Sequence, residues 1–461
     1  MYERSQLAAR REAIARGAGF HGVLLVAAGQ PIPIAGTDQS HEFHAHPDHR
    51  YLAGLEVPGA VLTLDPFEGW QLFAPVPDIE DRVWVGDGVP LEELAARAGM
   101  DRARPLTELD AWLERRRGEP MAIAGNHDIL HRPERYGLAP WEALEPDVHR
   151  EASEHISQQL AEMRRAKDAE ELERMRAAGA ASLRGHLAAM RLARPGMTER
   201  QVEVEIEAEF FRGGAPRTAY GSIVGSGSNG AILHIAPSNR ELREGDIVMV
   251  DAGAEMEGYA SDVSRTWPVS GRFEGAQRDL YQLVLSVQEA AIADARPGKE
   301  YRELHLDACE RMARGLVDLG ILRGDPASLV ERDAHALFFP HGLGHMLGLA
   351  THDAGGCLAG RNPSDRFGLK WLRADLPLQP DYVVTIEPGF YVIDALLRDP
   401  LRRETYHDAV NWERVDGLAG FGGIRIEDDV RITGGEAEVL TAAIPKQIDA
   451  IEALRREALE R

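Results

Sequence analysis

A repeated pattern in the second part of the chain constrains the fold more than any other feature. The tetrapeptide Ala-Arg-Pro-Gly occurs at residues 193–196 and again at 295–298, each time between two helical patterns. Each copy leads to an apolar run that closes on a carboxylate, and these runs end at Asp251 and Glu387. The pattern predicts two related helix–turn–helix–strand units that share one site. The alternative is a coincidence, because a Pro-Gly entry into a helix is common.

The first third of the chain has a different pattern. Short apolar runs between Gly, Pro and Asp turns predict the strands of a mixed sheet with a helix among them. The runs lie at residues 23–27, 60–64, 70–74 and 121–124, and the helix at 91–98. A charged, Ala- and Leu-rich stretch at 148–191 then predicts long helices. We therefore expect two domains, a smaller α/β domain at residues 1–155 and a larger one at 156–461.

Charge and cysteine content exclude several classes of protein. The 461 residues include 52 Lys and Arg against 75 Asp and Glu, a formal net charge of −23, which argues against nucleic-acid or anionic-membrane partners. Cys309 and Cys357 are too few for a disulfide framework. The N-terminal residues contain no apolar signal region, and no apolar stretch approaches the ~20 residues of a membrane span. We expect a soluble, cytoplasmic protein.

Two aspartates follow one another closely along the chain. Asp251 ends the run IVMVD, and Asp262 comes eleven positions later, beyond Glu257 and Gly258. A hairpin turning at these two residues would place both aspartates on neighbouring strands, facing one side. Like charges at that distance repel, so the arrangement calls for a cation between them. Two surface aspartates on a hairpin are the alternative.

Histidines and glutamates add to this pair of aspartates. His341, His345 and His352 lie within twelve residues, and the glycines around the first two bring backbone close to whatever they contact. Glu387 and Glu427 both end runs that are typical of buried strands, where a carboxylate must be paired or bind a metal. An ion pair between Glu427 and Arg425, two residues before it, is the alternative.

The sum of these charges points to metal ions. Four carboxylates carry four negative charges, and a neutral His345 adds none, so two divalent cations would balance them. The four are Asp251, Asp262, Glu387 and Glu427. Oxygen-rich ligands with one nitrogen suit Mn²⁺ or a similar ion. Two such ions bridged by carboxylates activate water and polarise a carbonyl, which is the chemistry of a hydrolase.

Two other motifs have a weaker claim to function. The sequence GSGSNG at residues 225–230 matches the dinucleotide fingerprint, but no helix pattern follows it, so we expect no nucleotide site. Four histidines near the N-terminus lack carboxylates around them, and we expect a solvated or interface cluster rather than a metal site. They are His41, His44, His46 and His49.

Five motifs together resemble the "pita-bread" metallopeptidases, and within them the Xaa-Pro group of prolidase and aminopeptidase P. The motifs are IVMVDAG, YASDVSRTW, FFPHGLGHMLGLATHD, TIEPGFY and GGIRIED. The resemblance implies an α+β fold, with a pita-bread catalytic domain preceded by a smaller creatinase-like α/β domain. It also implies a homodimer and two divalent metal ions, Mn²⁺ first, with Zn²⁺ or Co²⁺ possible.

The resemblance also implies a role for each candidate residue. Asp251 would bind one metal, His345 and Glu387 the other, and Asp262 and Glu427 would bridge the two. His234 would line the substrate pocket and His352 would contact the scissile carbonyl. His341 and Arg425 would orient the site, and Tyr220 matches a pocket tyrosine.

Prolidases carry an arginine for the substrate carboxylate where this chain has Arg373. On that basis we prefer an Xaa-Pro dipeptidase that releases free proline. In that reading Glu387 passes a proton to the proline nitrogen. The first alternative is an aminopeptidase P, which removes the residue before proline from longer peptides. A non-catalytic peptide-binding module and a metal-free creatinase-type hydrolase are the remaining ones, and both would lack these ligands.

Overall fold

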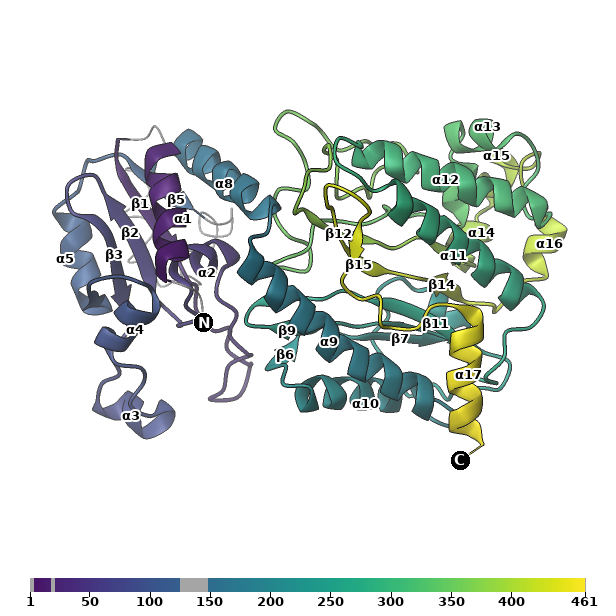
Figure 1. Cartoon of the computed structure of the whole chain (residues 1–461), viewed down its shortest axis with the longest axis horizontal. Helices are drawn as coiled ribbons and strands as arrows, with labels where there is room; N and C mark the ends of the chain where they lie inside the picture. Colours follow the sequence, from purple (N-terminus) through teal and green to yellow (C-terminus); the bar gives the residue numbers. More distant parts are fainter. Residues whose placement is uncertain (1–3, 18–20, 125–147, 461) are drawn as a thin grey trace. The chain divides into compact units, whose positions relative to one another are not determined.

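The chain divides into two compact units, Met1–Arg164 and Arg165–Arg461. The computed structural model describes residues 4–17, 21–124 and 148–460, and each unit is treated by itself (Figure 1). Within these ranges no helix combines the length and the apolar character that crossing a membrane requires. Both cysteines, the buried Cys309 and the exposed Cys357, are free thiols, as the sequence predicts.

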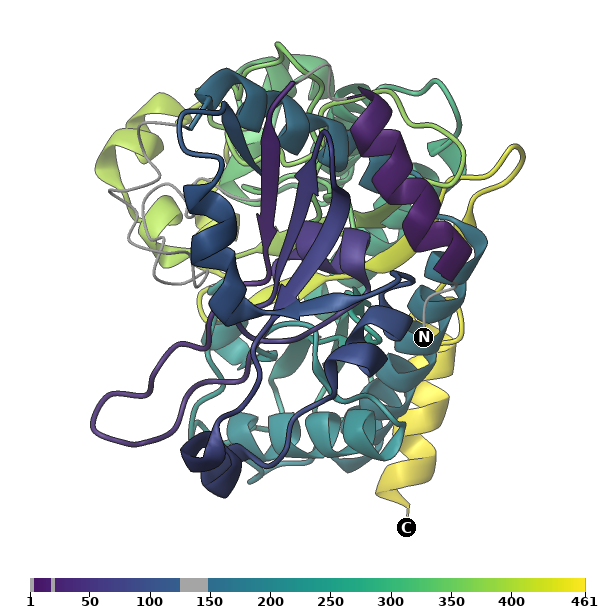
Figure 2. The same cartoon turned by 90° about the vertical axis from the view of Figure 1, so that its left-hand side faces the viewer.

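The N-terminal unit is built on a five-stranded mixed sheet in the order β4-β3-β2-β1-β5, which Figure 2 turns toward the viewer. Strand β1 pairs antiparallel with β2 and parallel with β5, so the predicted mixed sheet is confirmed. Its side chains are buried because the sheet packs on Trp112 and its neighbours. The elements are α1 (Arg4–Gly17), β1 (Val23–Ala27), α2 (Pro47–Ala53), β2 (Val61–Asp65), β3 (Gly69–Ala74), α3 (Ile79–Val85), α4 (Leu91–Arg97), β4 (Ala103–Pro105), η1 (Leu106–Glu108), α5 (Leu109–Glu114), β5 (Met121–Ala124) and α8 (Arg150–Arg165).

The second unit combines four small sheets with two pairs of long helices. Figure 1 shows α9 beside α10 and α11 beside α12, with the strands running between the two pairs. The sheets are β10-β9-β6, β11-β8-β7, β12-β15-β16 and β13-β14. The helices are α9 (Ala169–Leu192), α10 (Glu199–Arg212), α11 (Ala276–Asp294), α12 (Tyr301–Asp318), α13 (Pro326–Glu331), α14 (Asp394–Leu397), α15 (Pro400–Thr405), α16 (Trp412–Asp416), α17 (Ile448–Leu459), η4 (Gly227–Ala231) and η5 (Ala334–Leu337). The strands are β6 (Arg217–Thr218), β7 (Ile223–Ser226), β8 (Ile247–Asp251), β9 (Ala254–Met256), β10 (Tyr259–Ala260), β11 (Ser264–Pro268), β12 (Val383–Ile386), β13 (Gly389–Tyr391), β14 (Gly423–Arg425), β15 (Asp428–Arg431) and β16 (Glu438–Val439).

The predicted internal repeat is present and extends to single hydrogen bonds. Gly196 and Gly298 end the two Pro-Gly turns with φ of 86° and 84°, a left-handed conformation that glycine adopts without strain. The Gly196 amide donates to Leu242 O at 3.0 Å, and the Gly298 amide donates to Leu378 O at 2.8 Å. The first strand after each contact, β8 and β12, leads to Asp251 and Glu387. The two halves therefore bring two candidate ligands into one region.

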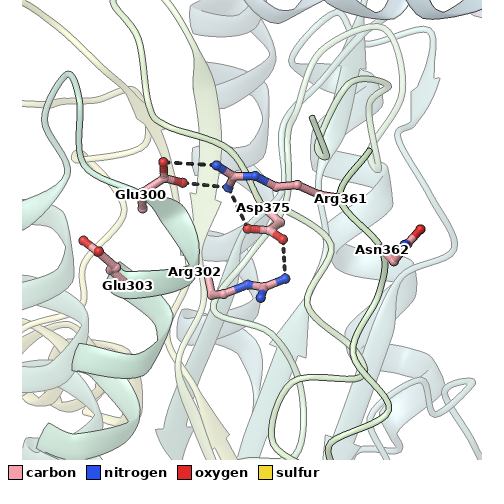
Figure 3. A pocket seen from close by; sticks show the side chains of 6 residues that line it. All are labelled: Glu300, Arg302, Glu303, Arg361, Asn362 and Asp375. Carbon is pink, nitrogen blue, oxygen red and sulfur yellow. Dashed lines mark hydrogen bonds and ion pairs between the residues drawn. The ribbon is translucent and has the colours of Figure 1, made fainter. Parts of the chain in front are cut away.

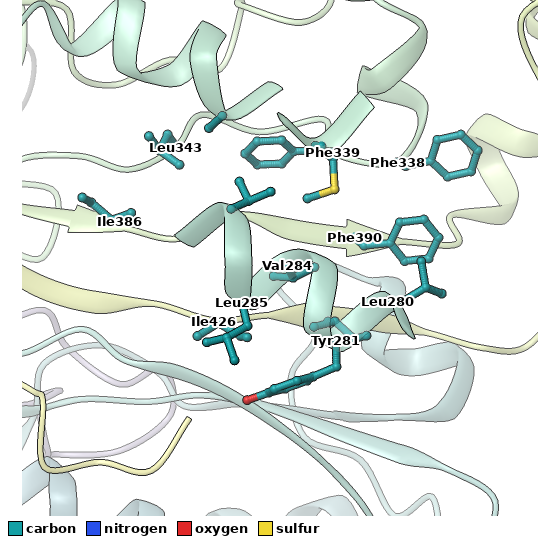
Figure 4. Packing of buried hydrophobic residues seen from close by; sticks show 14 of the residues in the cluster. Leu280, Tyr281, Val284, Leu285, Phe338, Phe339, Leu343, Ile386, Phe390 and Ile426 are labelled. Carbon is teal, nitrogen blue, oxygen red and sulfur yellow. The ribbon is translucent and has the colours of Figure 1, made fainter. Parts of the chain in front are cut away.

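The core of this unit explains why the candidate carboxylates face away from it. Figure 4 shows α11 side chains such as Leu285 packing toward Ile386 and Ile426, both completely buried. Each of these isoleucines directly precedes a candidate ligand, Glu387 or Glu427. Successive side chains of an extended segment point to opposite sides, so burying the isoleucines directs the carboxylates outward from the core.

Candidate functional site

A cavity of about 460 Å³ in the second unit gathers ten of the eleven candidate residues from the sequence. Tyr220 is the eleventh, and it contacts two of the lining carboxylates. The lining residues are Leu233, His234, Asp251, Asp262, His341, Gly342, Gly344, His345, His352, Trp371, Arg373, Glu387, Arg425 and Glu427. Four carboxylates and two guanidinium groups thus share one space, which leaves two negative charges uncompensated.

The two aspartates are placed by the predicted hairpin. Strands β9 and β10 pair antiparallel, and Glu257 and Gly258 form the turn with φ of 48° and 91°. Asp251 ends β8 opposite Ser264 of β11, and Asp262 lies just before β11. The Tyr220 hydroxyl lies 2.6 Å from Oδ1 of both aspartates. One hydroxyl proton serves only one of the two oxygens, so the pair needs a further positive group.

The His-Gly-Leu-Gly-His segment holds His345 through its backbone. A Cβ atom on Gly344 would lie 2.1 Å from Thr385 O, so only glycine permits this close approach to β12. The His345 Nδ1–H donates to Met346 O at 3.0 Å, which leaves Nε2 facing the carboxylates. Nε2 lies 3.4 Å from Asp262 Oδ2 and 3.9 Å from Glu387 Oε1.

Three of these side chains fit a metal ion. Asp262, His345 and Glu427 are buried, and each offers a ligand atom within 4.8 Å of the others; the described ranges contain one such group. A second-sphere bond to a carbonyl, as at His345 Nδ1, is typical of metal-ligating histidines. Asp251 and Glu387 line the same cavity and could complete the ligand set.

The pKa values of the buried side chains in this cluster are shifted from their ordinary values. Burial raises the pKa of Glu387 to about 7 and that of Glu427 well above its ordinary value. Burial lowers the pKa of His345, but its hydrogen bond to Asp262 and the nearby negative charges outweigh this, so the pKa is raised. Burial thus disfavours charged carboxylates here, and neighbouring negative charges add to the shifts of Glu427 and His345; a bound cation would offset both effects.

Arg425 pairs with a carboxylate from another strand, so the Arg425–Glu427 ion pair, the alternative weighed from the sequence, is wrong. Its Nη2 donates to Asp251 Oδ2 at 2.6 Å, and its Nε donates to Ser264 Oγ at 2.8 Å. The Ser264 hydroxyl in turn donates to Glu427 Oε2 at 2.7 Å. Arg425 therefore links two candidate ligands and leaves Glu427 free to face the cavity.

His341 is held in its neutral form by a chain of hydrogen bonds. Arg425 Nη1 donates to the Tyr391 hydroxyl at 2.9 Å, and that hydroxyl lies 2.9 Å from His341 Nε2. His341 Nδ1–H donates to Gly342 O at 2.8 Å, so Nε2 accepts the tyrosine proton. Burial lowers the pKa of His341 to about 3, which agrees with this neutral tautomer.

The remaining candidates line the wall of the cavity. His234, His352 and Arg373 are exposed, and the His352 ring meets the His345 ring edge-on with centroids 4.5 Å apart. Trp371, which is 57% exposed, stands next to Arg373 in the same lining. Trp371 is not among the residues predicted from the sequence; the available signal was an apolar side chain two residues from a candidate arginine.

A network of charges fixes the segment that carries Trp371 and Arg373. Arg361 forms a bidentate pair with Glu300 and also bonds Asp375 Oδ1 at 3.0 Å, while Arg302 bonds the other oxygen of Asp375 (Figure 3). These residues line a second cavity of about 380 Å³ at the start of α12. Because Arg302 and Arg361 already pair with Glu300 and Asp375, these side chains leave few unpaired charges for a ligand.

The structure describes the surroundings of both weaker motifs. Of the four N-terminal histidines, His41 and His44 are exposed, whereas His49 is buried in α2 and His46 caps that helix by accepting from the Asp48 amide. The GSGSNG segment continues as the short helix η4 rather than a long helix, so the expected absence of a dinucleotide fingerprint helix agrees with the fold.

The comparisons with known proteins agree with this geometry. Residues 173–434 match the model of metallopeptidase family M24, and residues 7–121 match that of the aminopeptidase P N-terminal domain. The chain is 35% identical over 433 residues to the Xaa-Pro aminopeptidase of Escherichia coli, covering 90% of each chain. It is 34% identical over 407 residues to that of Haemophilus influenzae, covering 88% of this chain and 86% of the other.

Solved structures give the same result for the fold. The aminopeptidase PepP of Pseudomonas aeruginosa matches with a TM-score of 0.84 at 31% identity, over 100% of this chain and 99% of the other. A zinc-substituted E. coli aminopeptidase P in complex with product matches with a TM-score of 0.83 at 33% identity, over 99% of each. The expected pita-bread fold is confirmed, and the relatives favour the aminopeptidase alternative over the prolidase we preferred from the sequence. The chain is a metallopeptidase, and it belongs to family M24 with an aminopeptidase P type N-terminal domain.

Proposed function

We propose that this chain is an Xaa-Pro aminopeptidase, which hydrolyses the bond between an N-terminal residue and a following proline. The single observation that carries the proposal is the convergence of Asp262, His345 and Glu427 in one cavity with Asp251 and Glu387. Relatives that match nearly the whole chain are named Xaa-Pro aminopeptidases. The X–Pro bond has no N–H, so a dedicated site is needed to recognise it.

The proposed ligand set holds two divalent cations. Asp251 would hold one ion, His345 and Glu387 would hold the other, and Asp262 and Glu427 would contribute to both. Mostly oxygen ligands with one imidazole suit Mn²⁺, and Zn²⁺ and Co²⁺ accept the same set. When bound, such ions lower the pKa of water and polarise the scissile carbonyl.

The surrounding side chains supply the remaining steps. His352, on the cavity wall beside His345, is placed to donate a hydrogen bond to the scissile carbonyl oxygen. Glu387, which lines the same cavity, would pass a proton to the proline nitrogen, which is a poor leaving group unless protonated. His234 lines the same cavity and would contact the substrate there.

An Xaa-Pro dipeptidase is the second candidate, and Arg373 is the observation that favours it. Its guanidinium lines the cavity, and no hydrogen bond or ion pair of its side chain is found among the described residues. A free cation at this place could bind the carboxylate of a dipeptide ending in proline. In an aminopeptidase the same group would face the chain beyond proline.

A paired assay separates the two candidates. The purified protein with added Mn²⁺ is given an Xaa-Pro dipeptide and the matching Xaa-Pro-Yaa tripeptide, and kcat/KM is measured for both. A preference for the tripeptide supports the aminopeptidase, and cleavage of the dipeptide alone supports the dipeptidase. Arg373→Met should weaken the dipeptide reaction selectively if the guanidinium binds its carboxylate. No cleavage of either peptide by the metal-loaded protein would refute both.

Three expectations from the sequence stay predictions. Manganese as the native ion is tested by metal analysis of protein purified without added metal. The homodimer is tested by light scattering in solution. The cytoplasmic location is tested by fractionation of the source cells.

A further inference from the structure

The GSGSNG segment at residues 225–230 packs against the strand that carries Arg425. A Cβ atom added to Gly422 would lie 2.0 Å from Gly227 O, and one added to Gly423 would lie 2.3 Å from Gly230 O. Glycines on both sides therefore allow η4 and the start of β14 to touch backbone to backbone. The GSGSNG segment therefore supports β14, the strand that carries Arg425, by direct backbone contact.

A single buried carboxylate organises this segment. Glu199, the first residue of α10, is completely buried. Its Oε1 accepts from the amide and the hydroxyl of Ser226, both at 2.8 Å. Its Oε2 accepts from the Ser238 hydroxyl at 2.6 Å and the Ser238 amide at 3.3 Å. Asn229 Nδ2 donates to both oxygens, at 3.1 and 3.0 Å.

These bonds hold both ends of the segment that contains His234. Ser226 precedes η4 and Ser238 follows the turn-containing stretch after it, so one carboxylate oxygen fixes each end. Leu233 and His234, in between, line the cavity. The side chain of Glu199 itself does not line it. Glu199 can therefore influence the cavity only through residues 226–238, which it holds.

The internal repeat places a second supporting residue at the same position. Glu199 stands three residues after Gly196, and Tyr301 stands three residues after Gly298, each at the start of its helix. The Tyr301 hydroxyl donates to Thr385 O at 2.7 Å, and Thr385 Oγ1 accepts from the His345 amide at 3.2 Å. Each half of the unit therefore supports a segment bearing one cavity histidine from the first residue of its second helix.

We propose that Glu199 is a positioning residue, which sets His234 for the reaction by holding both ends of its segment. The inference rests on the proposed function and deepens it. Five donor groups need two anionic oxygens, and a glutamine would offer one acceptor and turn an amide donor toward the others. Glu199→Gln therefore releases one end of the segment while keeping the size of the side chain.

The test compares Glu199→Gln with the wild type, alone and in a His234→Ala background. We expect kcat to fall by about 10²-fold in Glu199→Gln, with KM changed by less than about threefold, because small misplacements of a reacting group have costs of that order. In the His234→Ala background the same substitution should cost less than about threefold. Ser238→Ala, which removes one donor only, should give a smaller loss in the same direction.

Hydrogen exchange gives a readout that does not depend on activity. Peptides covering residues 226–241 should exchange faster in Glu199→Gln than in the wild type, at equal metal content. Asp65→Asn is the matched control, because Asp65 is a buried carboxylate with several donors in the N-terminal unit. It should leave both kcat and the exchange of these peptides unchanged.

The possible results separate this inference from the proposed function. If Glu199→Gln exchanged faster but kept the kcat of the wild type, the positioning role would be overturned. The same holds if Glu199→Gln lowered kcat as strongly in the His234→Ala background as in the wild type. If hydrogen exchange of residues 226–241 were unchanged in Glu199→Gln, Glu199 would not hold this segment. A wild type that cleaves no Xaa-Pro peptide would refute the proposed function, and the exchange data alone would then decide whether Glu199 holds the segment.

Discussion

Arg425, the last residue of β14, donates to Asp251 Oδ2 at 2.6 Å, and not to Glu427 two positions further along the chain. The two partners are 174 residues apart in the sequence and belong to different halves of the internal repeat. The same guanidinium also donates to Ser264 and Tyr391, so all three of its nitrogens are engaged. Arg425 therefore fixes Asp251 directly and Glu427 through Ser264, so that two proposed metal ligands from different halves keep their relative positions.

Replacing Arg425 by Lys keeps the positive charge but removes the planar guanidinium group, whose three nitrogens donate to three partners. A lysine ammonium cannot reach Asp251, Ser264 and Tyr391 in the same geometry. We expect metal affinity to fall by about 10–100-fold, as for other groups that orient metal ligands. Metal titration followed by calorimetry measures this. Arg431→Lys is the control, because Arg431 pairs with Asp381 and Glu438 away from the cavity. Unchanged metal affinity in Arg425→Lys would contradict the orienting role.

Replacing Asp262 or Glu427 by Ala should abolish metal binding and peptide hydrolysis together. Both carboxylates are assigned to both ions, so the loss of either removes a ligand from each. Metal content by mass spectrometry and kcat on a tripeptide are the measurements. Asp408→Ala serves as control, since Asp408 forms an exposed pair with Arg332. A variant that still binds two ions would show that the replaced carboxylate is not a bridge.

The strand ends of the site could be predicted from the sequence, because a buried apolar run that closes on a carboxylate is a local pattern. Asp251 and Glu387 were found in this way, and the hairpin turn at Gly258 was as well. Arg425 and Glu427 both line the cavity, as their spacing predicts, although the strand ends at Arg425 and Glu427 lies beyond it. Their partners could not be predicted, since the sequence does not say which distant carboxylate a guanidinium meets.

Ser264 and Tyr391 show what local patterns miss. Ser264 lies beside Asp251 through strand pairing, but its hydroxyl bonds Glu427, 163 residues away. Tyr391 connects Arg425 to His341 from a strand that carries no other polar signal. Both are ordinary polar residues of short buried strands, and only the pairing of distant segments gives them a role.

Gly344→Ala tests how closely the histidine segment approaches β12. The new Cβ would lie 2.1 Å from Thr385 O and 2.4 Å from the Tyr301 hydroxyl, so the segment must move. We expect a loss of free energy of unfolding at the upper end of the about 1–3 kcal/mol typical of overpacking, together with weaker metal binding. Denaturant unfolding and metal titration measure the two effects.

Gly245→Ala is the matched control for this substitution. A Cβ atom at Gly245 meets nothing within 4 Å, and the residue has no positive φ. The control should unfold as the wild type does and bind metal equally well. If Gly344→Ala also behaved like the wild type, the close contact with Thr385 and Tyr301 would not constrain His345.

Acidification should destabilise the second unit through its buried neutral histidines. Burial lowers the pKa of His305 to about 4, against about 6.5 in an unfolded chain, and its Nε2 donates to Gly368 O at 3.0 Å. Between these two values the unfolded chain binds the proton and the folded one does not, so the free energy of unfolding falls as pH falls. From pH 7 to pH 5 this histidine accounts for about 2 kcal/mol of that loss.

His305→Gln isolates this contribution, because a glutamine amide can also donate to Gly368 O but does not titrate. Its free energy of unfolding should fall by about 2 kcal/mol less than that of the wild type when urea titrations at pH 7 and pH 5 are compared. His407→Gln, at an exposed position, controls for the exchange itself. An equal loss in wild type and His305→Gln would mean that His305 binds its proton in the folded protein, which would require its ring to leave the buried contact with Gly368.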